Sequence, residues 1–362
     1  TQAGAHNDGI GVAFSGSTSL ENRYLVDGID ITGLTYGDVG TPVLNEFVHE
    51  IEVLAGGYNA EWGRAIGGIV NIVTKTGSNQ FKGSIFGTFA PGFLTAARKS
   101  SPVNASSIDI TADRAYTADF GMELGGPSVK DTLWFYAGFA PPLARTDFTR
   151  SVKSQMDCRR VNPDGTSTDC DRSLADGAPD VDPVTGFNET IEVDHDVRSA
   201  SSRTYSMIGK LNYAATADHQ AQVSAIVVPN SNRSPGLLGL PTSGTRGNGT
   251  TMDFAARWTS KLGEKTEVEA LVAWHHSTYE NGSLDPTLDD TPRQILTNGS
   301  LGTWSQLGGE SAATMGMCRD GGSGDLFPTI TNCPMSTQSY AIGGPGALSD
   351  DREDRRMARL AV

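Results

Sequence analysis

The most constraining feature of this sequence is the repeated alternation of apolar and polar residues along short stretches. The clearest stretches are 119–124, 205–213, 253–261 and 266–274. In the stretch 253–261, Phe254 and Trp258 alternate with Asp253 and Arg257. Because successive side chains of a strand point to opposite faces, each stretch is expected to be a β-strand with one apolar and one polar face.

The connections between the expected strands alternate between short and long. Short connections are expected at 125–131, 215–219 and 262–265, and long ones at about 91–113, 151–202, 229–250 and 277–350. Tight turns at one end and long loops at the other are typical of transmembrane β-barrels. A soluble β-sandwich is the alternative, but it rarely carries structureless loops of this length. Several aromatic residues lie near strand ends, as in the girdles of a membrane barrel: Trp134, Tyr136, Tyr205, Tyr213, Trp258 and Trp274.

Charge and motif content narrow the function classes. The 362 residues carry a net charge of −14, which argues against nucleic-acid binding, because phosphate contacts need clustered Lys and Arg. No apolar run is long enough for a transmembrane helix, whereas a spanning strand needs only about 9–11 residues. The sequence contains no G-x-S-x-G, H-E-x-x-H or P-loop signature, so we expect no enzyme.

Four cysteines occur as two local pairs, Cys158 with Cys170 and Cys318 with Cys333. Each pair brackets a polar loop rich in Gly, Asp, Ser and Thr. Local pairs of this kind favour two disulfides formed in an oxidising compartment. A zinc site is the alternative, although the sequence has no C-x-x-C spacing and its six histidines lie elsewhere.

Two groups of residues were considered as metal ligands. Asp176, Asp180 and Asp182 cluster in ADGAPDVDPVTG, and calcium takes oxygen ligands from such loops. The segment lacks the D-x-D-x-D-G spacing, so a solvated acidic turn is the alternative to a structural calcium ion, the only cofactor considered. His275 and His276 are adjacent on an expected strand and point to opposite faces, so we do not expect them to share a metal.

Three segments resemble one known family. IEVLAGGYNAEWGRAIGGIVNIVTKTGSNQFKGS, residues 51–84, resembles the end of the plug domain of TonB-dependent outer-membrane receptors and the start of their first barrel strand. YLVDGIDITG, residues 24–33, resembles a plug strand and turn. GGPSVKDTLWFYAGF, residues 125–139, resembles the first periplasmic turn and the third strand of the family's barrel. The layout most resembles the Oar-like subgroup.

The resemblance implies a division into a plug domain, residues 1–79, and the first strands and extracellular loops of a barrel, residues 80–362. The expected fold is mainly β: a transmembrane antiparallel barrel with an α+β plug in its lumen. Thr41-Pro42 favours the start of a plug helix over about residues 41–50. Plugged barrels of this kind have about 22 strands, of which about eight are expected here. The sequence opens without a signal peptide. We therefore expect it to be one part of a longer chain.

Polar contacts are expected to hold the plug in a polar lumen, each contributing about 0–1 kcal/mol where water reaches it. Glycines in the plug allow strands to cross closely. The expected contact residues are Glu61, Arg64 and Lys75 on the plug and Asp253, Arg257, Glu267 and Glu269 on the barrel. A structural clamp is the expected role of Glu61 and Arg64, with direct substrate contact as the alternative. Arg-Gly pairs that are frequent in the family are replaced here by Ser15-Gly16 and Ala55-Gly56.

The function implied by the resemblance is transport across the bacterial outer membrane, with the long loops extracellular. The expected partners are the energy transducer TonB, outer-membrane lipid and lipopolysaccharide, and an unidentified external small molecule, peptide or protein. The alternative is a surface platform for adhesion, protein export or assembly that works through its large disulfide-bearing loops. A soluble secreted β-protein is a third interpretation.

Overall fold

The computed structural model describes residues 5–7, 12–14, 16–34, 36–57, 63, 65–96, 108–156, 158, 170, 180–239, 241–296, 319–320, 330–331 and 340–362. Within these ranges the chain forms a four-stranded sheet between residues 23 and 74 and a ten-stranded sheet between residues 82 and 361. We call them the plug sheet and the barrel sheet. No described helix has the length and apolar character needed to cross a membrane.

The barrel sheet is antiparallel throughout. Its strands are β7 (Lys82–Pro91), β8 (Ile108–Val129), β9 (Leu133–Ala140), β10 (Leu143–Gln155), β11 (Thr190–Thr204), β12 (Ser206–Ala214), β13 (His219–Ser234), β14 (Thr245–Leu262), β15 (Thr266–Ser283) and β20 (Ser349–Ala361).

Two passes across the barrel sheet are interrupted. Pro141 and Pro142 separate β9 from β10, and Tyr205 separates β11 from β12. Proline cannot donate to the sheet ladder, which explains the first break. β9 and β10 both pair with β8, β11 and β12 both pair with β13, and the two interrupted passes pair with each other through β10–β11 and β9–β12. The ten described strands therefore make eight passes, the number predicted from the alternation.

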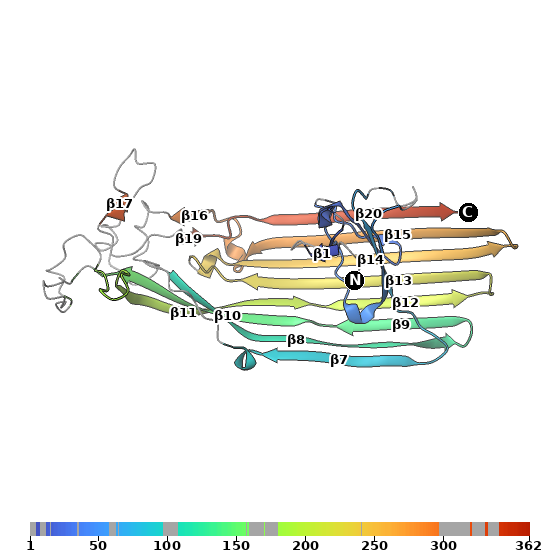
Figure 1. Cartoon of the computed structure of the whole chain (residues 1–362), viewed down its shortest axis with the longest axis horizontal. Helices are drawn as coiled ribbons and strands as arrows, with labels where there is room; N and C mark the ends of the chain where they lie inside the picture. The colour runs from blue at the N-terminus through green and yellow to red at the C-terminus, as the bar shows by residue number, and fades with distance from the viewer. Residues whose placement is uncertain are drawn as a thin grey trace.

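The short and long connections lie at opposite ends of the barrel sheet, as predicted (Figure 1). Residues 130–132, 215–218 and 263–265 make the short turns, and residues 92–107, 156–189, 235–244 and 284–348 join strands at the other end. Several strands are longer than a membrane span requires. β8 has 22 residues, and β14 and β15 have 18 each, against the roughly 9–11 that cross a bilayer.

One face of the barrel sheet presents exposed apolar side chains near the short turns. They alternate along the strands with buried residues of the opposite face, as predicted from the sequence: Phe120 47%, Met122 57%, Leu211 48%, Val223 51%, Phe254 39%, Trp258 43% and Val272 58% exposed. A continuous apolar face of this kind is what a barrel turns toward lipid. The plug sheet packs against the other face.

The plug sheet has the strand order β4-β3-β6-β5. Its strands are β3 (Arg23–Val26), β4 (Ile29–Asp30), β5 (Val48–Leu54) and β6 (Ile69–Thr74), with β3 parallel to β6. Asp27 and Gly28 turn the chain between β3 and β4 with φ of 49° and 85°. Figure 1 shows this sheet crossing the long strands of the barrel sheet.

The helix predicted near residues 41–50 does not form, so within the described residues the plug is not α+β. A single 3-10 turn, η2 (Asn45–Phe47), leads directly into β5. The segment from Glu50 to Val53 alternates polar and branched apolar residues with a period of two, and β5 pairs with β6 over most of its length. This strand pairing outweighs the Thr41-Pro42 signal for a helix start.

The remaining described elements are short. The 3-10 turns are η1 (Ser19–Glu21), η4 (Gly92–Leu94), η6 (Pro241–Ser243) and η7 (Pro286–Leu288), and the small strands are β1 (Ala5–Asn7), β2 (Val12–Phe14), β16 (Arg293–Leu296), β17 (Arg319–Asp320), β18 (Ile330–Thr331) and β19 (Tyr340–Gly343).

An apolar cluster joins the plug sheet to the barrel sheet, which corrects the expectation of a purely hydrophilic interface. The plug contributes Tyr24, Val26, Ile29, Ile31, Phe47 and Val70, and the barrel sheet contributes Tyr136, Ala140, Ile208, Ile226, Val228, Ala255 and Leu271. All thirteen are at most 8% exposed. The short plug strands have too few residues to enclose a core alone, so they complete one against the barrel wall.

Candidate functional site at the plug–barrel interface

The turn between β3 and β4 carries a deeply buried ion pair of the interface. The Lys210 ammonium group on β12 donates to the Asp27 carboxylate at 2.9 Å and to the Thr74 carbonyl at 3.0 Å. The Lys210 and Asp27 side chains are only 1% and 3% exposed. Asp27 also accepts from the Thr74 amide and hydroxyl, and Arg257 on β14 donates to the Asp27 carbonyl at 2.9 Å.

A second contact joins the plug to β14 and β15. The Thr41 hydroxyl donates to one oxygen of the Asp253 carboxylate at 2.6 Å, and Nδ1 of His275 lies 2.7 Å from the other oxygen. Thr41 and Asp253 are fully buried, and His275 is 1% exposed. The Asp253 carboxylate therefore holds a plug hydroxyl and a barrel imidazole together without contact with water.

A third contact joins the plug to β20. The Arg355 guanidinium donates to the carboxylate of Asp30 at 2.7 Å and to the Thr32 carbonyl. Glu353 accepts from the amide of Leu34 at 3.1 Å. Arg23 holds the same Asp30 carboxylate at 3.1 Å. The plug segment that follows β4 is thus bonded to the barrel sheet through the side chains of Arg355 and Glu353.

A fourth contact lies where the plug passes into β7. The Lys75 ammonium group is 2.8 Å from the Glu123 carboxylate on β8, which also accepts from Tyr136 and Ser84. Lys75 is 35% exposed and Glu123 10% exposed, so water reaches this pair more readily than it reaches Lys210. Tyr136 points into the interface rather than toward the lipid side, contrary to its prediction as a girdle residue.

The structure brings some of the predicted contact residues together and places others elsewhere. Lys75, Asp253 and Arg257 all bond across the interface. Glu269 instead pairs with Arg359 of the adjacent β20, and Glu267 is exposed near the short turns. Both share the inward side of β15 with His275 but lie closer to the turn end than the plug reaches. Glu61 and Arg64 lie outside the described residues.

Sequence reasoning missed five of the residues that matter most here: Asp27, Glu123, Lys210, His275 and Arg355. Lys210 lies in the alternating stretch 205–213, and Asp27 lies in the segment YLVDGIDITG, which resembles a plug strand and turn. Their pairing depends on where the plug sheet lies against the barrel sheet, and local sequence carries no signal for that.

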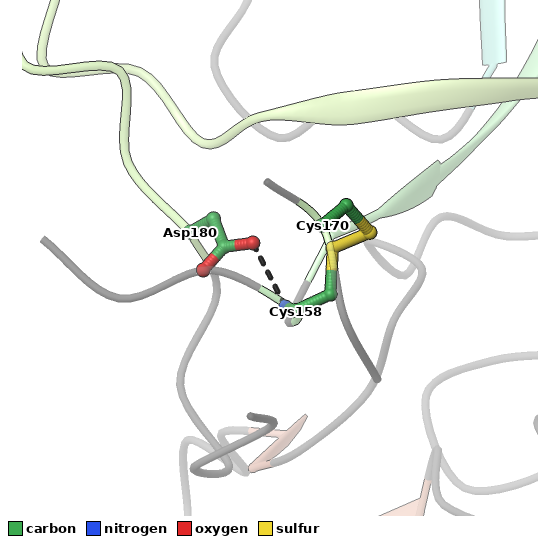
Figure 2. Close-up of a disulfide and its surroundings, with 3 residues drawn as sticks. All are labelled: Cys158, Cys170 and Asp180. Carbon is green, nitrogen blue, oxygen red and sulfur yellow. Dashed lines mark hydrogen bonds between the residues drawn. A yellow bond between two sulfur atoms is a disulfide. The ribbon is translucent and has the colours of Figure 1, made fainter. Parts of the chain in front are cut away.

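A disulfide closes the start of the long connection between β10 and β11. Cys158 and Cys170 are bonded, with an S–S distance of 2.04 Å, and the Cys158 amide donates to the Asp180 carboxylate at 2.9 Å (Figure 2). Cys158 is 3% exposed. The second predicted pair, Cys318 with Cys333, lies outside the described residues.

The aspartates predicted as calcium ligands are described only in part. Asp182 accepts from the amides of Thr185 and Val184, and these bonds lower the pKa of its carboxyl group. Asp180 is bonded to the Cys158 amide, and Asp176 lies outside the described residues. Within the part of the chain that is described, no three His, Cys, Asp or Glu side chains are grouped to hold a metal. A calcium site stays a prediction.

Comparisons with known proteins agree with this arrangement. No family model matches the sequence. The chain is 31% identical to the TonB-dependent transporter Oar of Myxococcus xanthus over 98% of its own length and 34% of that protein, so it spans about a third of this relative.

Two solved structures of outer-membrane proteins are similar to lower degrees. The ferric enterobactin receptor PfeA of Pseudomonas aeruginosa is 16% identical, with 79% of this chain and 39% of that chain covered and a TM-score of 0.43. The outer membrane transporter YddB of Escherichia coli is 12% identical, with the same coverage and a TM-score of 0.42. The sequence match alone carries the comparison: the chain is similar to about a third of a TonB-dependent transporter.

Proposed function

We propose that this chain forms the plug and part of the barrel of an outer-membrane transporter that imports an external ligand when the plug rearranges. The observation that carries the proposal is the plug sheet packed against the inward face of a sheet whose other face is apolar. TonB is the proposed source of force on the plug, by analogy with the transporter that the sequence matches.

The contacts of the interface suggest how the plug is held and how it gives way. The Lys75–Glu123 pair is the weaker contact: the Lys75 side chain is 35% exposed, so water reaches its ammonium group, and a solvated pair contributes about 0–1 kcal/mol. Lys210 and Asp27 form a buried pair, and breaking such a pair costs about 3–5 kcal/mol because a charge is left without a partner. The partly exposed pair should therefore break at a lower pulling force on the plug than the buried pair.

The orientation proposed is short turns toward the periplasm and long connections toward the outside, as in barrels of this type. The Cys158–Cys170 disulfide lies in a long connection. A disulfide is maintained outside the reducing cytoplasm, which supports an extracytoplasmic location for this end of the sheet. The outer-leaflet lipid and lipopolysaccharide would then surround the apolar face.

A surface platform for adhesion, export or assembly is the second candidate. The observation in its favour is the length of the connections at residues 156–189 and 284–348, the first of which carries the disulfide. Such a protein would use its loops and would not need a movable plug. The two candidates therefore differ in whether locking the plug abolishes function.

A reversible lock separates the candidates. Thr41→Cys combined with Asp253→Cys places two thiols on neighbouring positions, whose native side-chain oxygen atoms are 2.6 Å apart. Untargeted mass spectrometry would compare the spent media of four strains. One expresses the full-length wild type, one expresses the locked variant, one has the gene deleted, and one lacks TonB. If the protein is a transporter, wild-type cells should deplete one compound that the deletion strain, the strain lacking TonB and the locked variant leave in the medium. Adding reductant should restore depletion by the variant. Unchanged media, with adhesion or secretion unaffected by the lock, would favour the platform.

A further inference from the structure

The pass formed by β12 and β11 carries two tyrosines that mark a membrane-sized interval on the face turned away from the plug. Tyr213 lies near the short turn after β12, and Tyr205 lies between β12 and β11. With Leu211 and Met207 between them, these side chains are 37–48% exposed. The interval 205–213 is nine residues long, within the roughly 9–11 that cross a bilayer. Because tyrosines are enriched where a barrel meets the membrane surface, Tyr205 marks the hydrocarbon boundary on the side of the long connections.

The next residue on this face beyond Tyr205 is an arginine, and the neighbouring strands add three more. Arg203 lies two positions farther along the pass, about 7 Å at the rise of a strand. Arg233 on β13 and Arg145 on β10 lie diagonal to Arg203, one on each side. Arg246 on β14 lies directly opposite Arg233. Because directly opposite and diagonal positions share a face of the sheet, these four arginines form one group, which we call the arginine cluster.

The two outer members of the cluster have carboxylate partners. The Arg145 guanidinium is 2.8 Å from the Asp147 carboxylate. The Arg246 guanidinium is 3.2 Å from the carboxylate of Asp289 and 3.8 Å from that of Glu280. These carboxylates therefore balance charge at the two sides of the cluster and not in its middle.

The two inner members have no partner of opposite charge. Arg203 and Arg233 are exposed, and neither forms an ion pair with any residue that the structure describes. Arg233 also faces Arg246 directly across the β13–β14 ladder. Like charges directly opposite each other destabilise a sheet, so this arrangement costs stability unless an anion lies against it. Since the chain has a net charge of −14, a general excess of arginine does not explain the cluster.

We propose that Arg203 and Arg233 bind the phosphate groups of an outer-leaflet lipid, with Arg145 and Arg246 at the sides of the site. A guanidinium group matches phosphate with two parallel hydrogen bonds. The occupant is a lipid because the site begins at the first position beyond Tyr205, at the height of lipid headgroups. The apolar side chains between the two tyrosines lie directly below, where the acyl chains of the same lipid would pack. Basic residues beside a membrane-spanning segment are typical of anionic-lipid recognition.

The proposal rests on the membrane setting and orientation of the proposed function, but it needs neither TonB nor a transported ligand. We would titrate purified full-length protein in detergent with bisphosphorylated lipid A, with the same lipid after removal of its phosphates, and with inorganic phosphate. Native mass spectrometry counts the bound lipid and gives its dissociation constant. The wild type should bind the bisphosphorylated lipid about 25-fold more tightly than the dephosphorylated lipid, at about fivefold for each arginine near an anionic lipid.

Variants of the inner arginines complete the test, each verified as folded by its heat-modifiable migration in gels. Arg203→Gln combined with Arg233→Gln should weaken binding of the bisphosphorylated lipid about 25-fold. Arg203→Gln alone should weaken it about fivefold and decides the question if the double variant does not assemble. Lys130→Gln combined with Lys265→Gln is the matched control, because it removes two exposed positive charges from the short turns at the other end of the sheet. The control should bind as the wild type does.

The proposal is overturned if the wild type binds both lipids equally, or if the arginine variants bind the bisphosphorylated lipid as tightly as the control does. Displacement of the lipid by inorganic phosphate at equal phosphate concentration would also overturn it, because the site would then recognise a soluble anion. None of these results would change the outcome of the plug lock, which depends on the opposite face of the sheet. An ineffective plug lock would in turn leave lipid binding in place.

Discussion

The Lys210–Asp27 pair allows a quantitative test of how the plug is anchored. Lys210→Met removes the ammonium group and leaves the Asp27 carboxylate buried, with only the Thr74 amide and hydroxyl as donors. Breaking a buried pair from one side costs about 3–5 kcal/mol. Because two donors remain, we expect the lower end of the range, about 3 kcal/mol. At about 1.4 kcal/mol per factor of ten, local opening should increase about 100-fold.

Hydrogen exchange of the β3 and β6 amides in the full-length protein measures this opening directly. Asp27→Asn combined with Lys210→Met leaves no buried charge, so it should recover most of the lost protection. This recovery separates the charge from the packing of the lysine stem. If the single variant exchanges within about threefold of the wild type, or if the double variant is no better than the single, the pair does not anchor the plug as inferred from the structure.

Three further predictions concern the turn, the lipid-facing side and the disulfide. Gly28→Ala should destabilise the plug sheet by about 1–2 kcal/mol, because φ is 85° and a Cβ would lie 2.4 Å from the Arg257 guanidinium; exchange of the plug amides measures the loss. Phe254→Lys should cost about 2–4 kcal/mol if that face contacts hydrocarbon, reducing the folded fraction in outer-membrane preparations; normal assembly would contradict the assignment. Cys158→Ser with Cys170→Ser should speed proteolysis between the two positions and leave exchange in β10 and β11 unchanged.

The barrel strands could be predicted from the sequence because lipid and lumen impose opposite demands on alternate residues. Phe254 and Trp258 face outward and Asp253 and Arg257 face inward, as the period-two pattern indicates. The pattern records which face a side chain occupies but not how far along the strand the plug reaches. Glu269 therefore lies on the correct face and bonds to a neighbouring strand instead of the plug.

The plug was harder to predict, since its residues depend on the barrel for their environment. Phe47 is buried in the cluster shared by the two sheets, and β5 is fixed by its pairing with β6. Neither fact is visible in the local sequence, where Thr41-Pro42 resembles a helix start. Lys210 and Asp27 are 183 positions apart, so their pairing is decided by tertiary packing alone.

The apolar cluster limits how far the plug could move in the proposed transport. Fully burying one large apolar side chain contributes about 1.5–3 kcal/mol, so extracting the six plug members of the cluster would cost on the order of 10 kcal/mol before any ion pair is broken. Residues 31–34 and 36–41, which follow β4, contribute only Ile31 to that cluster, whereas Leu34 and Thr41 hydrogen-bond to Glu353 and Asp253. We therefore propose that opening begins with this segment while Tyr24, Phe47 and Val70 remain packed against the barrel sheet.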